Sequence, residues 1–157
     1  MIIKIDSNDN ALENDYNDID ITGTNVLIAE DNDMNWEIIN ILLDMYGVSS
    51  ERAETGRECV EKLVSSSDGK YNLIFMDIQM PEMNGIEATK KIRLLDDVKK
   101  ANIPIVAMTA DAFSENIAEC INAGMNGHIA KPIDIDIVIR EIKKIRSQQK
   151  WKKFYVF

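Results

Sequence analysis

A chain of 157 residues that is 45% hydrophobic and 29% charged has the length and composition of one globular domain with a core of its own. Its formal net charge of −9 argues against general nucleic-acid binding, which needs a basic surface. No apolar stretch approaches the roughly 20 residues of a membrane-spanning helix, and the chain does not open like a signal peptide. We therefore expect a cytoplasmic location without membrane contact.

The first 23 residues are rich in Asn, Asp and Ser, and we expect them to form an acidic, flexible leader or linker. Six acids stand against one lysine here, so −5 of the net charge of −9 lies in this segment. The apolar residues 1–5 could instead pair as an edge strand. Beyond residue 23, short apolar runs alternate with longer amphipathic stretches, which is typical of βα units around a parallel sheet.

Five strands and five helices are predicted in strict alternation. The strands are expected at residues 25–30, 49–53, 72–77, 104–109 and 127–130. The helices are expected at residues 35–46, 56–66, from about 84 onward, 113–123 and 134–147. The second strand is polar, which suits the edge of a sheet. Right-handed crossovers then place helices on both faces of the sheet.

Apolar stripes and capping residues indicate where these helices lie. In the first helix the stripe consists of Ile38, Ile39, Leu42, Leu43 and Tyr46. In the fourth helix it consists of Ile117, Cys120 and Ile121. The clearest stripe, in the fifth helix, consists of Ile135, Val138, Ile139, Ile142 and Ile145. Asn84 can cap the third helix, with Glu87 reaching back as in a capping box. Cys59 and Cys120 are interpreted as small core residues of a protein in a reducing compartment.

Chemically active side chains stand where four of the five predicted strands end. They are Glu30, Asp31, Asp77, Thr109 and Lys131. Open α/β sheets bind ligands outside the carboxyl ends of their strands, so these residues are expected to form one site. Three converging carboxylates would repel one another unless a cation lay between them. Oxygen ligands without His or Cys favour Mg²⁺.

This combination suits a transferred phosphoryl group. Mg²⁺ and Lys131 would neutralise its oxygens, and Thr109 would donate a hydrogen bond to one of them. A carboxylate oxygen of Asp77 would be the attacking atom and would form an acyl phosphate. The small Ala110 would leave room for the group. A cis Lys131–Pro132 bond is expected, because X–Pro bonds adopt cis at small cost and this one would aim the ammonium group.

The chain resembles the receiver domain of two-component response regulators over residues 24–146. The resemblance rests on Glu30-Asp31, Asp77, Thr109-Ala110 and Lys131-Pro132, and above all on the sequence Met-Asp-Ile-Gln-Met-Pro-Glu-Met-Asn-Gly at residues 76–85. The segments 28–32 and 128–132 are similar in particular to receivers attached to hybrid sensor histidine kinases. The resemblance implies a flavodoxin-like, doubly wound sheet of five parallel strands in the order 2-1-3-4-5, with five helices on both faces.

The resemblance also implies a role for each site residue. Asp77 would take the phosphoryl group from a histidine kinase or a histidine phosphotransfer protein, and the domain would catalyse part of its own phosphorylation and dephosphorylation. Asp31, Asp77 and the backbone carbonyl of Gln79 would bind Mg²⁺ directly, and Glu30 would act mainly through water. Thr109 would swing inward on phosphorylation, and the face formed by the fourth helix, fifth strand and fifth helix would be read by partners.

His128 departs from the pattern of many relatives, which carry an aromatic residue three positions before the lysine. An imidazole that followed Thr109 would couple the switch to pH. The residues after 146 form a basic and aromatic tail at 147–157. It is interpreted as an extension of the last helix against its own domain, or as a docking segment for a partner or for the acidic leader of a second copy, which would give a dimer.

Three other functions remain as alternatives or are disfavoured. A free-standing single-domain response regulator is the alternative to the receiver of a hybrid kinase. A haloacid-dehalogenase-like phosphohydrolase would need a second Asp two residues after Asp77, where Gln79 stands. A DNA-binding regulator is not expected, because about eleven residues follow the receiver.

Overall fold

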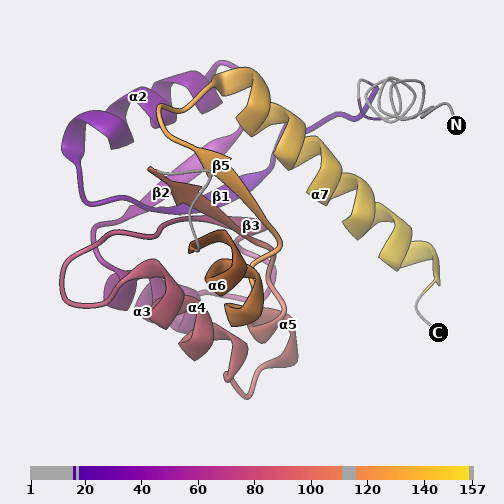
Figure 1. Ribbon diagram of the computed structural model, residues 1–157. Coiled ribbons are helices and arrows are strands. Elements are labelled where there is room, and N and C mark those ends of the chain that lie inside the picture. The colour runs from indigo at the N-terminus through magenta and orange to yellow at the C-terminus, as the bar shows by residue number, and fades with distance from the viewer. Residues whose placement is uncertain (1–15, 17, 111–115, 156–157) are drawn as a thin grey trace, which may run out of the picture.

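The computed structural model describes residues 16, 18–110 and 116–155, with the side chains of residue 116 and of residues from 150 onward left aside. Five parallel strands form one sheet in the order β2-β1-β3-β4-β5 (Figure 1). They are β1 (Asn25–Ala29), β2 (Ser49–Ala53), β3 (Leu73–Asp77), β4 (Ile105–Thr109) and β5 (Gly127–Ala130). The predicted strand order is confirmed, and the polar strand β2 lies at one edge, as expected.

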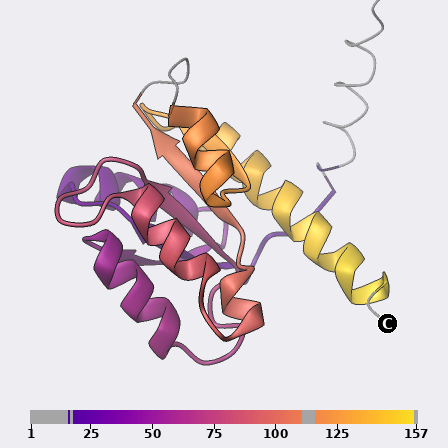
Figure 2. The same cartoon turned by 60° about the horizontal axis from the view of Figure 1, so that its bottom comes forward.

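Helices alternate with the strands and cover both faces of the sheet. They are α2 (Asp33–Asp44), α3 (Gly56–Ser65), α4 (Gly85–Arg93), α6 (Asn116–Ala123) and α7 (Ile135–Tyr155). One core lies between the sheet and α3, α4 and α6, and includes Leu27, Leu63 and Ile74. The other lies between the opposite face of the sheet and α2 and α7, and includes Leu43 and Phe75. Figures 1 and 2 show these three layers.

Three of the helices begin at residues whose side chains cap them. Asn32, Thr55 and Asn84 each accept a hydrogen bond from the backbone N–H three residues further on. Such caps stabilise a protein by about 1 kcal/mol each. The predicted pairing of Asn84 with Glu87 is present, but Glu87 accepts from the side-chain amide of Asn84, at 3.3 Å, and not from its backbone N–H.

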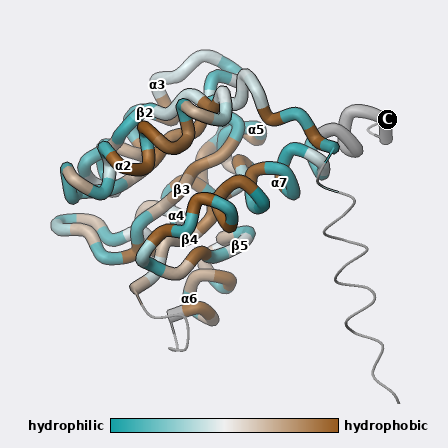
Figure 3. The backbone as a smooth tube through the Cα atoms, turned by 90° about the horizontal axis from the view of Figure 1, so that it is seen from above, coloured by the Kyte–Doolittle hydropathy of each residue, from teal (hydrophilic) through white to brown (hydrophobic). Residues whose placement is uncertain are grey.

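The predicted apolar stripe of the first helix is wrong for two residues. In α2 only Ile39 and Leu43 are buried, whereas Ile38 and Tyr46 are 50% and 41% exposed. Successive residues of a helix are turned by about 100°, so Ile38 cannot share the inward line of Ile39 and Leu43. The helix therefore carries apolar residues on its outer side as well, as the hydropathy colouring of α2 in Figure 3 indicates.

One short helix was not predicted, and the last helix continues beyond residue 147. The short helix α5 (Val98–Ala101) starts at Asp97, whose carboxylate caps it. Helix α7 runs to Tyr155, so residues 147–155 extend the last helix, which was one of the two interpretations of the tail; these residues include neither Gly nor Pro. The side-chain amide of Gln149 donates to the carbonyl oxygen of Asn72 at 2.9 Å, so the first part of the predicted tail packs against its own domain.

The remaining differences concern the first residues and α6. Ile21, which belongs to the segment predicted as a leader, is buried in the core. Residues 1–15 and 17, with the option of an edge strand at 1–5, lie outside the described residues. The predicted start of the fourth helix, at 113, also lies outside them. Ile121 is 61% exposed and does not share the inner face of Cys120. Among the described helices, none has the length and apolar character to cross a membrane.

Candidate functional site

The carboxyl edge of the sheet brings together the polar side chains that the sequence singled out. Glu30 follows β1, Asp77 ends β3, Thr109 ends β4 and Lys131 follows β5. These four strands are neighbours in the sheet, and all of them are parallel. The side chains of Glu30, Asp77 and Thr109 are buried, with the residues 0%, 5% and 3% exposed. The polar residues at the ends of these strands therefore form one cluster at the carboxyl edge of the sheet, with most of its side chains buried.

Lys131 joins the two buried carboxylates. Its Nζ atom lies 2.9 Å from Oδ2 of Asp77 and 3.1 Å from Oε2 of Glu30. The remaining oxygens are held by backbone groups, because the N–H of Gln79 donates to Oδ1 of Asp77 and the N–H of Asn32 donates to Oε1 of Glu30, both at 3.1 Å. Both carboxylates are thus fixed from two sides.

Asp31 completes a group of three acids that could hold a cation. One carboxylate oxygen from each of Glu30, Asp31 and Asp77 lies within 4.8 Å of the others. Asp31 is exposed, and among the described residues no hydrogen bond or ion pair engages its carboxylate. Three carboxylates at this separation, without His or Cys among them, match the oxygen ligands that hard divalent cations such as Mg²⁺ prefer. The side chain of Gln79 is exposed, and a role for its carbonyl oxygen stays a prediction.

Electrostatics at the site favour neutralisation of Asp77. Burial raises the pKa of Asp77, and Glu30 raises it further, against the opposing effect of Lys131. Burial alone would lower the pKa of Lys131, but its hydrogen bond and ion pair with Asp77, and then those with Glu30, raise it overall. The ammonium group therefore stays charged, while the Asp77 carboxylate would gain from a second positive charge nearby.

Thr109 offers an unused hydrogen-bond donor. Its Oγ1 atom is buried and has no hydrogen-bond partner among the described residues. In the sheet Thr109 follows Met108, which is paired with Asp77 on the neighbouring strand. A buried hydroxyl without a partner costs about 1–3 kcal/mol. Such a cost at this position indicates that the hydroxyl donates to a bound ligand, and an oxyanion would accept this hydrogen bond.

Gly85 allows helix α4 to start directly against the end of β3. A Cβ atom at Gly85 would overlap the carbonyl oxygen of Asp77 and lie 2.9 Å from Cγ of Met76. The N–H of Gly85 donates to the carbonyl oxygen of Ile78 at 2.9 Å, which closes the loop between them. This close approach explains why the stretch from 76 to 85 ends in glycine.

Two further predictions concern β5 and the residues after it. The Lys131–Pro132 bond is cis, as expected. His128 lies on β5 beside Ala107 and is exposed, so a role as a switch stays a prediction. The sequence did not point to Arg52 or Asn32, although both contact Glu30. The available signal for Arg52 was that it is the one basic residue of the short, polar strand β2.

Comparison with known proteins gives one consistent result. Residues 26–143 match the family model of the response regulator receiver domain. The osmosensing histidine protein kinase SLN1 of Saccharomyces cerevisiae is 43% identical over 115 residues, which cover 71% of this chain and 9% of that protein. The peroxide stress-activated histidine kinase mak1 of Schizosaccharomyces pombe is 36% identical, over 84% of this chain and 8% of its own length. The chain thus spans less than a tenth of both relatives.

Two solved structures show the same architecture. The receiver domain of a sensor histidine kinase from Pseudomonas aeruginosa, crystallised with a magnesium ion in its active-site cleft, is 28% identical with a TM-score of 0.72, over 80% of this chain and 99% of that one. The second structure is the receiver domain of Ssk1 from Saccharomyces cerevisiae, crystallised with the histidine phosphotransfer protein Ypd1. It is 33% identical to this chain, with a TM-score of 0.69. That match covers 80% of this chain and 90% of the other.

Proposed function

Because the chain belongs to the response regulator receiver family, we propose that it accepts a phosphoryl group from a phosphohistidine onto the carboxylate of Asp77. The observation that carries this proposal is the position of Asp77 at the end of β3, buried between Lys131 and the acids Glu30 and Asp31. A buried carboxylate with neighbouring charges of both signs can act as a nucleophile if the incoming negative charge is compensated.

The residues of the site have distinct roles in this reaction. An oxygen of Asp77 attacks phosphorus in line with the bond to the donor imidazole, and that bond breaks as the acyl phosphate forms. Lys131 stays hydrogen-bonded to Asp77 and neutralises charge on the phosphoryl oxygens. The unpartnered hydroxyl of Thr109 donates to one of these oxygens, which gives the phosphorylated state a contact that the free state lacks. We propose that this contact changes the face formed by α6, β5 and α7.

Magnesium fits the three acids and would be held by Asp31, Asp77 and the carbonyl oxygen of Gln79, where it would neutralise phosphoryl oxygens and align the group for attack. The oxygens of Glu30 already accept from Lys131 and from a backbone N–H, so we place Glu30 in contact with the ion mainly through water. Asp31 is the most accessible of the three.

Chemical trapping tests the assignment of the acceptor. The protein is incubated with Mg²⁺ and a small acyl phosphate and then treated with borohydride, which reduces an aspartyl phosphate to homoserine. Peptide mass spectrometry should find homoserine at position 77 and only after incubation with Mg²⁺. Homoserine at Asp31, or phosphate bound stably to Thr109, would overturn the proposal.

We infer that the donor is a protein that docks on the outer side of α2. This helix begins two residues after Asp31, and its outer side carries Met34, Ile38, Ile41 and Met45, which are 70%, 50%, 61% and 75% exposed. Their spacing of three or four residues aligns them along one face. An apolar face that starts beside the acceptor suits a partner that must bring a phosphohistidine to Asp77.

Phosphotransfer from a protein donor tests this surface separately from the chemistry. Phosphorylated Ypd1, the partner of the related Ssk1 receiver, serves as the probe. The Ile41→Glu substitution should slow transfer from Ypd1 at least tenfold and leave phosphorylation by the small acyl phosphate unchanged. Leu94→Glu, at an equally apolar position that is 82% exposed on another part of the domain, is the matched control. Equal rates for both variants with Ypd1 would exclude α2 as the docking face.

We propose that the chain acts as the receiver of a hybrid histidine kinase. Its relatives SLN1 and mak1 are much longer histidine kinases, and the chain matches a small part of each. A free-standing response regulator is the alternative, and the coding sequence around this chain distinguishes the two. The cytoplasmic location, the possible dimer and the domain boundaries at 24 and 146 stay predictions.

A further inference from the structure

Arg52 of the edge strand β2 holds the loop that carries Asp31. Its Nε atom donates to the backbone carbonyl oxygen of Glu30 at 2.9 Å, and its Nη1 atom lies 2.7 Å from the carboxylate of Asp33. Only Asp31 and Asn32 lie between these two attachment points. One guanidinium group therefore spans the segment that presents the accessible carboxylate of the acidic site.

The backbone of Glu30 is fixed to β2 through both its N–H and its carbonyl group. Its N–H donates to the carbonyl oxygen of Ala53 at 3.0 Å, and its carbonyl oxygen accepts from Arg52. This arrangement sets the direction in which the chain leaves β1. Since no described residue engages the carboxylate of Asp31, the position of that carboxylate depends on its backbone, which Arg52 holds at Glu30 and Asp33.

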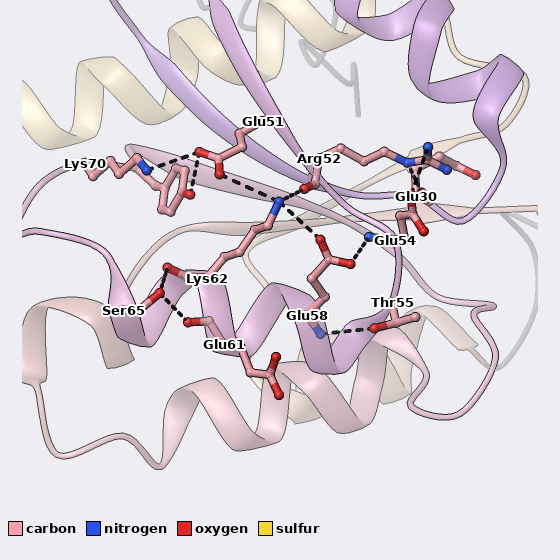
Figure 4. A network of polar contacts seen from close by, with 11 residues as sticks. Glu30, Glu51, Arg52, Glu54, Thr55, Glu58, Glu61, Lys62, Ser65 and Lys70 are labelled. Atoms are coloured by element: carbon pink, nitrogen blue, oxygen red, sulfur yellow. Dashed lines mark hydrogen bonds and ion pairs between the residues drawn. The ribbon is translucent and has the colours of Figure 1, made fainter.

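Arg52 is itself held in place by helix α3. Its backbone carbonyl oxygen accepts a hydrogen bond from Lys62, which also lies 3.2 Å from Glu58 and 3.7 Å from Glu51 (Figure 4). The Arg52 side chain is 15% exposed. Its Nη1 atom also lies 3.6 Å from the carboxylate of Glu54. A planar guanidinium loses little freedom when it binds separate partners together, and a lysine in its place could not reach both Glu30 and Asp33.

We propose that Arg52 is a positioning residue of the phosphoacceptor site, which presets the Asp31 carboxylate for the divalent cation. The inference rests on the proposed function, because it assigns Asp31 to the ion. Residues that orient metal ligands without touching the metal typically change its affinity by about 10- to 100-fold when they are replaced. Arg52 acts through the backbone of Glu30 and the side chain of Asp33, so the lower end of this range applies.

Charge alone would have the opposite effect, and this allows the two causes to be separated. Removing a cation near three acids should strengthen the binding of Mg²⁺, whereas loosening the loop should weaken it. Arg52→Lys keeps the charge and loses one of the two attachments. Arg52→Gln loses the charge and the ion pair with Asp33. Weaker binding in both variants is the signature of positioning.

Calorimetric titration with Mg²⁺ tests the proposal without any phosphoryl transfer. Arg52→Lys and Arg52→Gln should each raise the dissociation constant of Mg²⁺ roughly tenfold. Ser50→Ala is the matched control, because Ser50 also links β2 to α2, through Asn40 at 2.7 Å, but does not touch the Asp31 loop. The control should lower thermal stability and leave the affinity for Mg²⁺ unchanged. An Arg52→Lys protein with wild-type affinity would overturn the proposal.

Hydrogen exchange gives a second, metal-free measurement on the same variants. The amides of Asn32 to Trp36 should exchange faster in Arg52→Lys than in Ser50→Ala, relative to the wild type. Uniformly faster exchange across the sheet in Arg52→Lys would show a general loss of stability and would contradict a positioning role. If the wild-type protein itself bound no Mg²⁺, the proposed function would fail and not the assignment of Arg52 alone.

Discussion

The backbone N–H of Lys131 donates to the carbonyl oxygen of Thr109 at 2.7 Å, and this bond joins the ends of β5 and β4. The ammonium group of the same lysine reaches back to Asp77 at the end of β3. A hydroxyl, an ammonium and a carboxylate are thereby fixed relative to one another by three neighbouring strands. A movement of the Thr109 backbone would act directly on Lys131 through this bond.

The first prediction concerns the unpartnered hydroxyl of Thr109. This hydroxyl is buried and has no hydrogen-bond partner within the part of the chain that the structure describes. Thr109→Val replaces it with a methyl group, so the unphosphorylated protein should gain about 1 kcal/mol in its free energy of unfolding. Thr89→Val is the control, because the buried hydroxyl of Thr89 donates a hydrogen bond to the carbonyl oxygen of Gly85 at 2.8 Å. Loss of this bond should lower the free energy of unfolding by about 1 kcal/mol. Urea unfolding measures both, and a destabilised Thr109→Val protein would contradict the assignment.

The second prediction concerns the charge of Asp77 in metal-free protein. Its pKa is raised by burial and by Glu30, so the ionised carboxylate costs stability above that raised pKa, and the cost vanishes as the pH falls below the ordinary value of 3.8. Without Mg²⁺, Asp77→Asn should therefore melt at a higher temperature than wild type at pH 7, with a difference that shrinks toward pH 4. Added Mg²⁺ should raise the melting temperature of the wild type and leave the variant nearly unchanged. A variant that melts lower than wild type at pH 7 would contradict this reasoning.

The third prediction concerns Lys131. Lys131→Gln leaves Glu30 and Asp77 close together without their shared cation, so the free energy of unfolding in metal-free buffer should fall by about 3 kcal/mol. Mg²⁺ should restore part of this loss, because it replaces the missing positive charge. Denaturant titrations with and without Mg²⁺ make the comparison. A loss of the same size in both conditions would show that Lys131 does not compensate the acids.

How far the sequence alone predicts this molecule depends on whether the signal is local. Asp77 and Thr109 could be placed from sequence because apolar runs of strand length end at them and parallel strands end at one edge. The role of Arg52 could not, because Glu30 and Asp33, the partners that connect it to the loop of Asp31, lie on a different segment, with Glu30 22 residues away in the chain. Ile38 was assigned to the core because an apolar residue on a helix does not reveal which side faces the sheet.

The fourth prediction concerns Arg93, a partly buried cation whose hydrogen-bond partners among the described residues include no carboxylate. Its guanidinium donates to the carbonyl oxygens of Gly124, at 2.8 and 2.9 Å, and of Ala101 and Ile103, both at 2.7 Å. Burial lowers the pKa of Arg93, and these carbonyl groups satisfy its donors. Arg93→Met should reduce the free energy of unfolding by about 3 kcal/mol. Arg57→Met, at an exposed position of α3, should change it little. Similar decreases in the free energy of unfolding for the two variants would show that the hydrogen bonds of Arg93 contribute no particular stability.

The central claim is tested most directly by the intact mass of the wild type and of Asp77→Asn after incubation with acetyl phosphate. With Mg²⁺, the wild-type protein should gain the mass of one phosphoryl group, and a chelator present from the start should prevent the gain. The Asn variant, which retains Lys131, Thr109 and the neighbouring acids, should gain nothing under either condition. Addition of one phosphoryl group to both proteins at the same rate would contradict the account.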